Sequence, residues 1–592
     1  MTELCITATP TFNSKPQRLA DFATLPEALD YAAEGCTGFN FHDNRGRLLA
    51  PLGYVEVRRR AIEAARRLMS LGLERGDRVA VIADTDPAFM EVFFGCQYAG
   101  LVPVPMPIPM SIGGHERYVA RLERLIESCG ARVAIAPSHM VRYIEEIPSV
   151  DTLAFHGDID ALRALPNPED MVLEPSGPDE IAYLQYTSGS TGFPRGVEIR
   201  QHAIMANLRA ILASGLAVRP QDRCVSWLPF YHDMGLVGFV LGPMASQLSV
   251  DYLGPREFAM RPRLWLTLMT RNRGSIAFAP PFGYDLCTRR LHGSDIDRLD
   301  LSAWRVAGVG AEPVLPDVLD SFAEHFAAAG FDRRAFLPSY GMAENSLAVS
   351  FAPLGIGLSL DRVDRDVLEQ HGEARPLDDD RVAGLNTTSF VNCGHPLPGH
   401  DISIRDGDGH PLPERHVGRV TIRGPSLMSG YFHDHEQTRR VLGDDGWFDT
   451  GDLGYLTSQG LHVTGRHKDL IIINGRNIWP QDIEALASQM AGVNRGELTA
   501  MSAPPEESEV DVVVLLQTTL SDERARAALI KELSAGIRSE FGVRCTVSLL
   551  PPRTLPRTSS GKISRSQARR QYAAQLREAM DAVSTPSAAA SS

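Results

Sequence analysis

A short stretch rich in hydroxyl groups and glycines is the clearest candidate for chemistry in this chain. After the apolar run Ile181–Leu184, the sequence contains Thr187, Ser188, Gly189, Ser190, Thr191 and Gly192. Glycines let backbone amides approach an anion and hydroxyls donate further hydrogen bonds, so the stretch predicts a phosphate-binding loop. It lacks the Gly-x-x-x-x-Gly-Lys-Ser/Thr spacing of the nucleoside-triphosphate P-loop. A Ser/Gly cluster alone favours a flexible turn, but here the strand-like run Val197–Ile199 follows almost at once.

Four further polar residues stand in short motifs that follow strand-like runs or lie in tight turns. They are His232 in Tyr231–Gly235, Glu344 in Phe336–Glu344, Asp452 in Trp447–Gly454 and Lys562 in Leu555–Arg565. Each has a plainer interpretation when it is taken alone. A histidine beside an aromatic ring is often structural, an aspartate often caps a turn, and a glutamate or lysine is usually solvated.

Together these motifs resemble the adenylate-forming (acyl-activating, AMP-binding) enzyme superfamily, which includes acyl-CoA synthetases, luciferases and adenylation domains. Three stretches look most like its fatty acyl-AMP ligase branch: the flanks of the hydroxyl loop, Tyr231–Gly235, and 474–484. The resemblance implies that the hydroxyl loop binds the phosphates of ATP. Many relatives have lysine where this chain has Arg195, so no fixed phosphate contact is assigned to Arg195.

The resemblance also implies roles for single residues around the nucleotide. Tyr340 would stack on adenine, Asp452 would hold the ribose hydroxyls, and Glu344 would help to hold Mg²⁺ as a hard oxygen ligand. Lys562 is in the position of the catalytic lysine, and Lys468 is in the hinge position. The other implied adenine- or ribose-binding positions are Gly310, Ala311, Glu312, Gly341, Met342 and Arg466.

The acyl site is expected around His232, which the resemblance places near the reacting carboxylate. Met234 belongs to the same motif. We expect Gly235 and Gly238 to leave room for an alkyl chain along one face of the helix that follows His232.

The implied reaction uses ATP and Mg²⁺ to convert a fatty acid to its acyl-adenylate with release of pyrophosphate. The carboxylate attacks the α-phosphorus, and positioning and electrostatics supply the catalysis. The acyl group then passes to the phosphopantetheine thiol of a separate acyl carrier protein, or, as the alternative, to coenzyme A. A non-catalytic binding protein would be expected to lack Glu344, Asp452 or Lys562, and all three are present. The stretch Arg553–Arg577, which has no Asp or Glu, suits an acidic carrier and equally suits a solvated basic helix.

The elements that must position these residues alternate between strand and helix patterns. A helix at Tyr54–Leu71, a strand at Arg78–Ala83, a helix at Phe89–Ala99 and a strand at Arg132–Ala136 predict a parallel, doubly wound sheet. The proline-rich Val102–Pro109 between them is expected to be a rigid crossing segment.

The predicted fold class is α/β. A large N-terminal adenylation domain, residues 1–465, would contain doubly wound sheets and a small distorted β-barrel, the latter from the alternating runs of 396–432. A small mobile α+β C-terminal domain would cover 466–582, and an Ala/Ser-rich disordered tail 583–592. The segment 353–390 matches an insertion that the fatty acyl-AMP ligase branch is held to use to limit C-terminal domain motion and disfavour coenzyme A. A disordered surface loop is the alternative.

Composition excludes several classes of protein. The 592 residues are too many for one hydrophobic core, and 43% hydrophobic residues are ordinary for a globular protein. A net charge of −14 disfavours nucleic-acid binding. Without a Cys-x-x-Cys pair, a signal peptide or a long apolar span, we expect a cytoplasmic protein with no zinc site, disulfide framework or membrane span.

Overall fold

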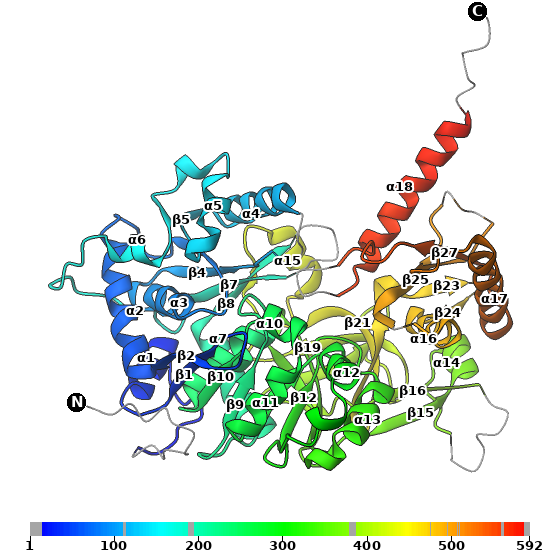
Figure 1. Cartoon of the computed structure of the whole chain (residues 1–592), viewed down its shortest axis with the longest axis horizontal. Helices are drawn as coiled ribbons and strands as arrows, with labels where there is room; N and C mark the ends of the chain where they lie inside the picture. The colour runs from blue at the N-terminus through cyan, green and yellow to red at the C-terminus, as the bar shows by residue number, and fades with distance from the viewer. Residues whose placement is uncertain are drawn as a thin grey trace, which may run out of the picture.

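The computed structural model describes residues 15–109, 114–187, 194–377, 386–473, 475–493, 495–505, 507, 509–557 and 562–584. Figure 1 shows the chain running from the N-terminal sheets on one side of the molecule to the C-terminal part on the other. The part expected to be a disordered tail lies, from 585 onward, outside the described residues. In the described residues, no helix has the length and apolar character needed to span a membrane.

A nine-stranded sheet forms the centre of the N-terminal part, in the order β17-β14-β13-β12-β11-β9-β10-β1-β2. Its six middle strands, β13 to β1 in that order, pair in parallel, whereas β2, β14 and β17 are antiparallel. The strands are β1 (Gly38–His42), β2 (Leu48–Gly53), β9 (Arg223–Ser226), β10 (Ser249–Tyr252), β11 (Ile276–Ala279), β12 (Val306–Val309), β13 (Phe336–Gly341), β14 (Ala348–Phe351) and β17 (His395–Pro396). Parallel strands joined by helices end at one edge of a sheet, which is where ligands bind in open α/β folds.

A second parallel sheet has the order β4-β3-β5-β6, with β3 (Arg78–Ile82), β4 (Val102–Met106), β5 (Ala131–Ile135) and β6 (Phe155–Gly157). The helices α2 (Tyr54–Met69), α3 (Pro87–Ala99) and α4 (His115–Cys129) come from the same region. The expectation of a crossing segment at Val102–Pro109 is wrong for its first half, which is strand β4; the proline content excluded only a central strand, and β4 lies at the end of the sheet order. The strand tolerates Pro103 and Pro105 because it lies at the end of the sheet order, where one row of backbone amides needs no partner in that sheet.

Two further antiparallel sheets, of three and four strands, belong to the N-terminal part. The strands β7 (Ile181–Thr187) and β8 (Arg195–Arg200) pair on either side of the hydroxyl loop, and β20 (Gly430–Tyr431) adds to β8. The part expected as a small distorted barrel is a four-stranded sheet, β18-β19-β21-β22. Its strands are β18 (Asp401–Arg405), β19 (Gly418–Arg423), β21 (Phe448–Thr457) and β22 (Gly460–Arg466).

The C-terminal part has its own hydrophobic core. The sheet β25-β26-β27 (Leu498–Ser502, Val512–Gln517 and Cys545–Leu550) packs with α16 (Pro480–Ala491) and α17 (Glu523–Phe541). The short pair β23 (Ile471–Ile473) and β24 (Arg476–Ile478) precedes it. The last helix, α18 (Arg565–Ser584), extends away from the rest of the molecule (Figure 1).

The segment 353–390 joins the two parts. Strands β15 (Leu360–Asp364) and β16 (Thr387–Val391) pair, and α14 (Arg365–His371) lies between them in sequence. Val363 and Leu368 are buried in one cluster with Trp479 of the C-terminal part. Arg365 NH1 is 2.8 Å from Glu540 Oε1, and Arg476 pairs with the buried Glu369. The described portion is thus a folded bridge; residues 378–385 lie outside it.

The α/β fold class predicted from the sequence is confirmed, with a large mixed-sheet part followed by a small C-terminal part. The expected helix at Tyr54–Leu71 and strand at Arg78–Ala83 appear within two residues of their predicted ends. The domain boundary at 465/466 remains a prediction.

Candidate active site

A cavity of about 460 Å³ lies where β13, β21, the 466–468 turn and Lys562 of the C-terminal part meet. Most of the residues singled out from the sequence line it: Thr187, His232, Met234, Gly238, Ala311, Tyr340, Gly341, Met342, Glu344, Asp452, Arg466, Lys468 and Lys562. Of the other singled-out residues, Gly235, Gly310 and Glu312 do not line it. Ser188, Gly189, Ser190, Thr191 and Gly192 lie outside the described residues.

His232 is the last residue before helix α8 (Asp233–Leu236) and faces the cavity. Its Nε2 atom is buried and has no hydrogen-bond partner among the described residues. Burial, with smaller contributions from Lys562 and Arg121, lowers the pKa of His232 from 6.5 to about 3. The imidazole is therefore neutral at physiological pH, with a free nitrogen that a ligand in the cavity can satisfy.

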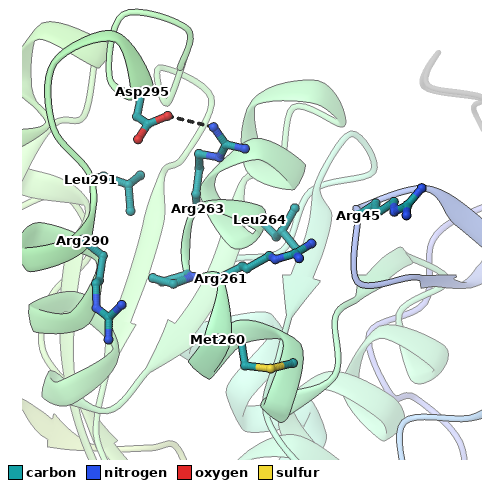
Figure 2. Close-up of a pocket in the computed structure, with 9 residues that line it drawn as sticks. Arg45, Met260, Arg261, Arg263, Leu264, Arg290, Leu291 and Asp295 are labelled. Atoms are coloured by element: carbon teal, nitrogen blue, oxygen red, sulfur yellow. Dashed lines mark hydrogen bonds and ion pairs between the residues drawn. The ribbon is translucent and has the colours of Figure 1, made fainter.

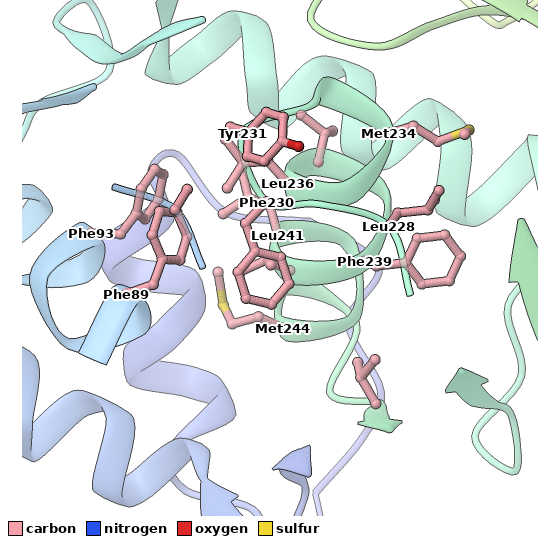
Figure 3. Close-up of a cluster of buried hydrophobic side chains, with 14 of the residues drawn as sticks. Phe89, Phe93, Leu228, Phe230, Tyr231, Met234, Leu236, Phe239, Leu241 and Met244 are labelled. Atoms are coloured by element: carbon pink, nitrogen blue, oxygen red, sulfur yellow. The ribbon is translucent and has the colours of Figure 1, made fainter. Parts of the chain in front are cut away.

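Aromatic packing fixes the chain that leads to His232. Phe230 is fully buried, and its ring centroid is 5.3 Å from that of Phe89 on α3. Met234 and Phe239 point away from Phe89 and Phe93 (Figure 3), and both line the cavity. One side of this segment thus anchors it in the core while the other forms the cavity wall.

One part of the cavity wall, called the apolar arm below, consists of hydrophobic side chains. The π-helical segments η3 (Ala210–Gly215) and η4 (Val237–Leu241) both contribute to it. Its apolar lining comprises Ile211, Leu212, Leu216, Val218, Phe239, Pro243, Leu248, Ile276, Phe278, Leu347 and Phe351. A wall of this composition suits a hydrocarbon chain, and π-helical turns are frequent at functional sites.

The two glycines expected beside the acyl chain have different surroundings. A Cβ on Gly238 would meet only Leu347 Cδ2, at 3.7 Å, and Gly238 lines the cavity. A Cβ on Gly235 would overlap the carbonyl oxygen of Pro229. The expectation that Gly235 leaves room for an alkyl chain is therefore not supported, because glycine at that position permits close backbone packing.

Glu344 and Tyr431 form a hydrogen-bonded pair at the cavity. Tyr431 Oη donates to Glu344 Oε1 at 2.9 Å, and burial raises the pKa of the Glu344 carboxyl. No ion pair involves Glu344 within the described chain. A buried carboxylate without a cationic partner is a suitable oxygen ligand for a hard divalent cation, so Glu344 fits Mg²⁺.

Asp452 lies between Tyr340 and Arg466. Tyr340 Oη donates to Asp452 Oδ2 at 2.7 Å, and Arg466 Nε is 3.6 Å from Asp452 Oδ1. Strands β21 and β22 bring Asp452 and Arg466 directly opposite each other. Burial raises the pKa of Asp452, and the nearby Arg466 opposes this shift. Tyr340 thus lies against the Asp452 carboxylate, which can also accept hydrogen bonds from the hydroxyl groups of a ligand.

Lys562 crosses from the C-terminal part into the cavity. Its ammonium donates to the carbonyl oxygen of Ala311, a residue with a positive φ of 66°. Burial lowers the pKa of Lys562, and the nearby Glu312 opposes the shift. Glu312 thus acts electrostatically on the ammonium although it does not line the cavity. An ammonium in these surroundings is well placed to stabilise developing negative charge.

Three features of the site were missed from the sequence. Asp233 lines the cavity, and burial raises the pKa of its carboxyl; it stood in the quoted motif directly after His232. Tyr431 reaches Glu344 through the β20–β8 pairing, which spacing does not reveal. Arg565 pairs with Asp469 and Glu484, at 2.9 and 2.7 Å, and so ties the Lys562 segment to the residue after Lys468.

Arg195, left without a role by the sequence, lines the cavity from β8. Its guanidinium carbon lies 5.3 Å from the centre of the Tyr431 ring, and its Nε is 3.6 Å from Asp434 Oδ2. Arg195 thus contacts the residue that hydrogen-bonds Glu344.

Solved structures share this architecture, and curated proteins are similar to the chain in sequence. A fatty acyl-adenylate ligase structure, from a study of the E. coli and L. pneumophila enzymes, is 50% identical, with a TM-score of 0.90 over 95% of this chain and 100% of that one. The 4-hydroxyphenylalkanoate adenylyltransferase of Mycobacterium marinum is 31% identical, over 95% of this chain and 94% of its own. A Caulobacter vibrioides protein with a provisional acyl-CoA synthetase name is 45% identical, over 96% and 98%.

Two family models cover most of the chain. The AMP-binding enzyme model matches residues 49–432, and the model for the AMP-binding enzyme C-terminal domain matches 475–570. The first alone covers well over half of the chain. The protein therefore belongs to the AMP-binding enzyme family and is an adenylate-forming ligase.

Proposed function

We propose that this ligase activates a fatty acid with ATP and transfers the acyl group to the phosphopantetheine thiol of a separate acyl carrier protein. The observation that carries the proposal is the single cavity in which an apolar arm, His232 and Lys562 meet. The arm would take the alkyl chain, and His232 and Lys562 would stand on either side of the reacting carboxylate.

In the first step, the fatty carboxylate attacks the α-phosphorus of ATP and pyrophosphate leaves. Lys562 would contact carboxylate and phosphate oxygens as negative charge moves between them. The free Nε2 atom of His232 would orient the carboxylate. Tyr340, Asp452 and Arg466 would hold the adenosine, so that positioning lowers the barrier.

Mg²⁺ would supply charge neutralisation for the triphosphate when it is bound. Glu344 is the residue proposed to hold it, with Thr187 and the hydroxyl loop on the phosphates. Tyr431 orients the Glu344 carboxylate through its hydrogen bond.

The choice of acceptor rests on the bridge formed by segment 353–390. Its contacts with the C-terminal part, through Arg365, Glu369 and Trp479, would resist rotation of that part. This supports a carrier protein over coenzyme A, if coenzyme A needs a larger rotation to reach the adenylate.

A paired assay tests both steps. We expect fatty acid and Mg·ATP to release pyrophosphate and form acyl-adenylate. We expect Lys562→Ala to slow this step by about a hundredfold or more, while the exposed-site control Lys531→Ala leaves it unchanged. A phosphopantetheinylated carrier protein should then accept the acyl group faster than coenzyme A does. Faster transfer to coenzyme A would establish an acyl-CoA synthetase, and absence of pyrophosphate release would contradict the enzyme itself.

A further inference from the structure

A second hollow, lined largely by arginines, lies apart from the central cavity. It has a volume of about 500 Å³ and shares no lining residue with that cavity. Its lining comprises Arg45, Met260, Arg261, Pro262, Arg263, Leu264, Arg290, Leu291 and Asp295. These residues come from the β1–β2 turn, from α10 (Pro255–Met260), α11 (Arg263–Arg271) and α12 (Pro281–Arg290), and from the loops beside them (Figure 2).

The charge of this hollow is opposite to that of the whole protein. Four arginines and one carboxylate, Asp295, line it, and Arg45 and Arg290 lie on opposite sides (Figure 2), whereas the chain carries a net charge of −14. Asp295 is already used, because its Oδ1 lies 2.8 Å from NH1 of Arg263. The positive charge of the other three arginines is therefore not neutralised by any carboxylate of the lining.

Two of the four arginines are held by contacts within the protein, and the other two have guanidinium groups available to bind a ligand. Arg263 is fixed by Asp295, and Arg261 NH1 donates to the backbone carbonyl of Asn44 at 2.9 Å. The side chains of Arg45 and Arg290 have no hydrogen-bond or ion-pair partner in the described part of the chain. A rim in which some guanidinium groups are already ordered loses less conformational entropy when an anion binds.

The floor of the hollow is apolar, because Pro262, Leu264 and Leu291 are buried. A flat cationic surface would suit an acidic protein, but a concave space of this volume suits a small ligand. Planar guanidinium groups bind phosphate oxygens in a bidentate manner. We propose that this hollow binds a small diphosphate-bearing anion, either free diphosphate or a diphosphate attached to an organic group that packs on Leu264 and Leu291.

Two tryptophans near the hollow, Trp227 and Trp265, can report ligand binding there by their fluorescence. Phe258 of α10 stacks on Trp227 with ring centroids 3.8 Å apart, and Trp265 follows Leu264 directly in sequence. A ligand that shifts α10 or α11 should therefore change tryptophan emission. This readout does not depend on turnover.

The test is a titration of the full-length protein with inorganic pyrophosphate and, separately, with uridine diphosphate, followed by calorimetry and tryptophan emission. Arg45→Glu/Arg290→Glu should lose a binding event that the wild type shows, with affinity weaker by about tenfold or more. The control Arg132→Glu/Arg219→Glu makes the same charge change at exposed arginines outside the hollow and should retain the event. Adenylate formation should be unchanged in both variants.

Equal affinities for the two probes would assign the site to free diphosphate, and tighter binding of uridine diphosphate would assign it to a diphosphate with an organic group. The proposal is overturned if neither probe binds outside the central cavity, or if the Arg45→Glu/Arg290→Glu variant titrates like its control. Should that double variant fail to fold, the milder Arg290→Gln provides the same comparison. Binding should also weaken as ionic strength rises, because the arginines are exposed.

Discussion

The neutral state of His232 has a consequence for stability as well as for ligand binding. The pKa of this buried imidazole is about 3 in the folded protein, against an ordinary 6.5. Because the pKa of His232 is lower in the folded state, its imidazole takes up a proton in the unfolded chain but not in the folded chain as pH falls below 6.5. Stability contributed by the neutral side chain is therefore complete above that pH and is lost progressively below it.

We expect His232→Gln to lose less stability than the wild type on acidification. At about pH 5 the wild-type penalty from this residue amounts to about 2 kcal/mol. Thermal unfolding midpoints of both proteins at about pH 7 and about pH 5 measure the difference. Equal falls in midpoint would mean that the imidazole takes up its proton within the folded state.

The two glycines after His232 form a matched pair for mutagenesis. Gly238→Leu should shorten the acyl chains that are accepted without unfolding the protein, because the new side chain enters the cavity. Gly235→Ala should instead reduce the yield of folded protein, because its Cβ overlaps the Pro229 carbonyl. Activity across a series of fatty acids, with a melting curve for each variant, separates the two effects. An unchanged chain-length profile in Gly238→Leu would contradict the assignment of the apolar arm.

At the scale of elements, helix α14 and strands β15 and β16 hold the C-terminal part against the large sheets. Arg365 pairs with Glu540, and Glu369 pairs with Arg476. Removing one partner of the Glu369 pair leaves a charge partly buried and unpaired, which is costly.

We expect Arg365→Glu/Glu369→Gln to raise acyl transfer to coenzyme A while adenylate formation is retained, because the C-terminal part gains freedom to rotate. The control Arg375→Glu alters an arginine of the same segment whose ion pair, with Glu373, stays within it. The ratio of acyl-CoA formed to pyrophosphate released is the measurement. A ratio that stays at the wild-type value would show that the bridge does not determine which acceptor receives the acyl group.

Much of this architecture could be predicted from local patterns, and the exceptions have physical reasons. Apolar periodicity predicted α2 and β3. The resemblance of the motifs to the adenylate-forming superfamily singled out His232, Tyr340, Glu344, Asp452 and Lys562, which line one cavity. Proline content argued against β4, since the pattern does not show that a strand will lie at the end of a sheet.

Contacts between distant segments could not be predicted. Spacing alone does not bring Tyr431 to Glu344, or Arg565 to both Asp469 and Glu484. The arginine-lined hollow combines Arg45 with Arg261 and Arg290, more than two hundred residues away in the sequence. Such sets become visible only when the sheets are assembled.

At the scale of the whole molecule, the basic stretch Arg553–Arg577 contains arginines that pair within the protein and arginines that are exposed to solvent. Arg565 is committed to Asp469 and Glu484, whereas Arg570 on α18 is exposed. Among the described residues, the Arg569 side chain donates to the backbone carbonyl of Ala503. We therefore expect the part of α18 that carries Arg569 and Arg570 to contact the proposed acidic carrier protein.

Charge reversal of Arg569 and Arg570 to glutamate should weaken acylation of the carrier and spare adenylate formation. The control Arg524→Glu/Lys531→Glu places the same charges on α17. Carrier acylation measured against carrier concentration, at low and high salt, shows whether the loss is in association. Equal loss of both half-reactions would mean that the substitutions disturb the Lys562 segment instead.

Lysine occurs at only four positions in this chain, Lys15, Lys468, Lys531 and Lys562. One of these, Lys562, donates to Ala311 across the junction of the two parts of the molecule. Amine-reactive labelling can therefore follow Lys562 against a background of few other lysines: we expect Lys562 to be shielded while the C-terminal part closes on the cavity and to react if that part moves away. The rate at which Lys562 is labelled, relative to exposed Lys531 as an internal standard, would measure how often the C-terminal part leaves the cavity during turnover.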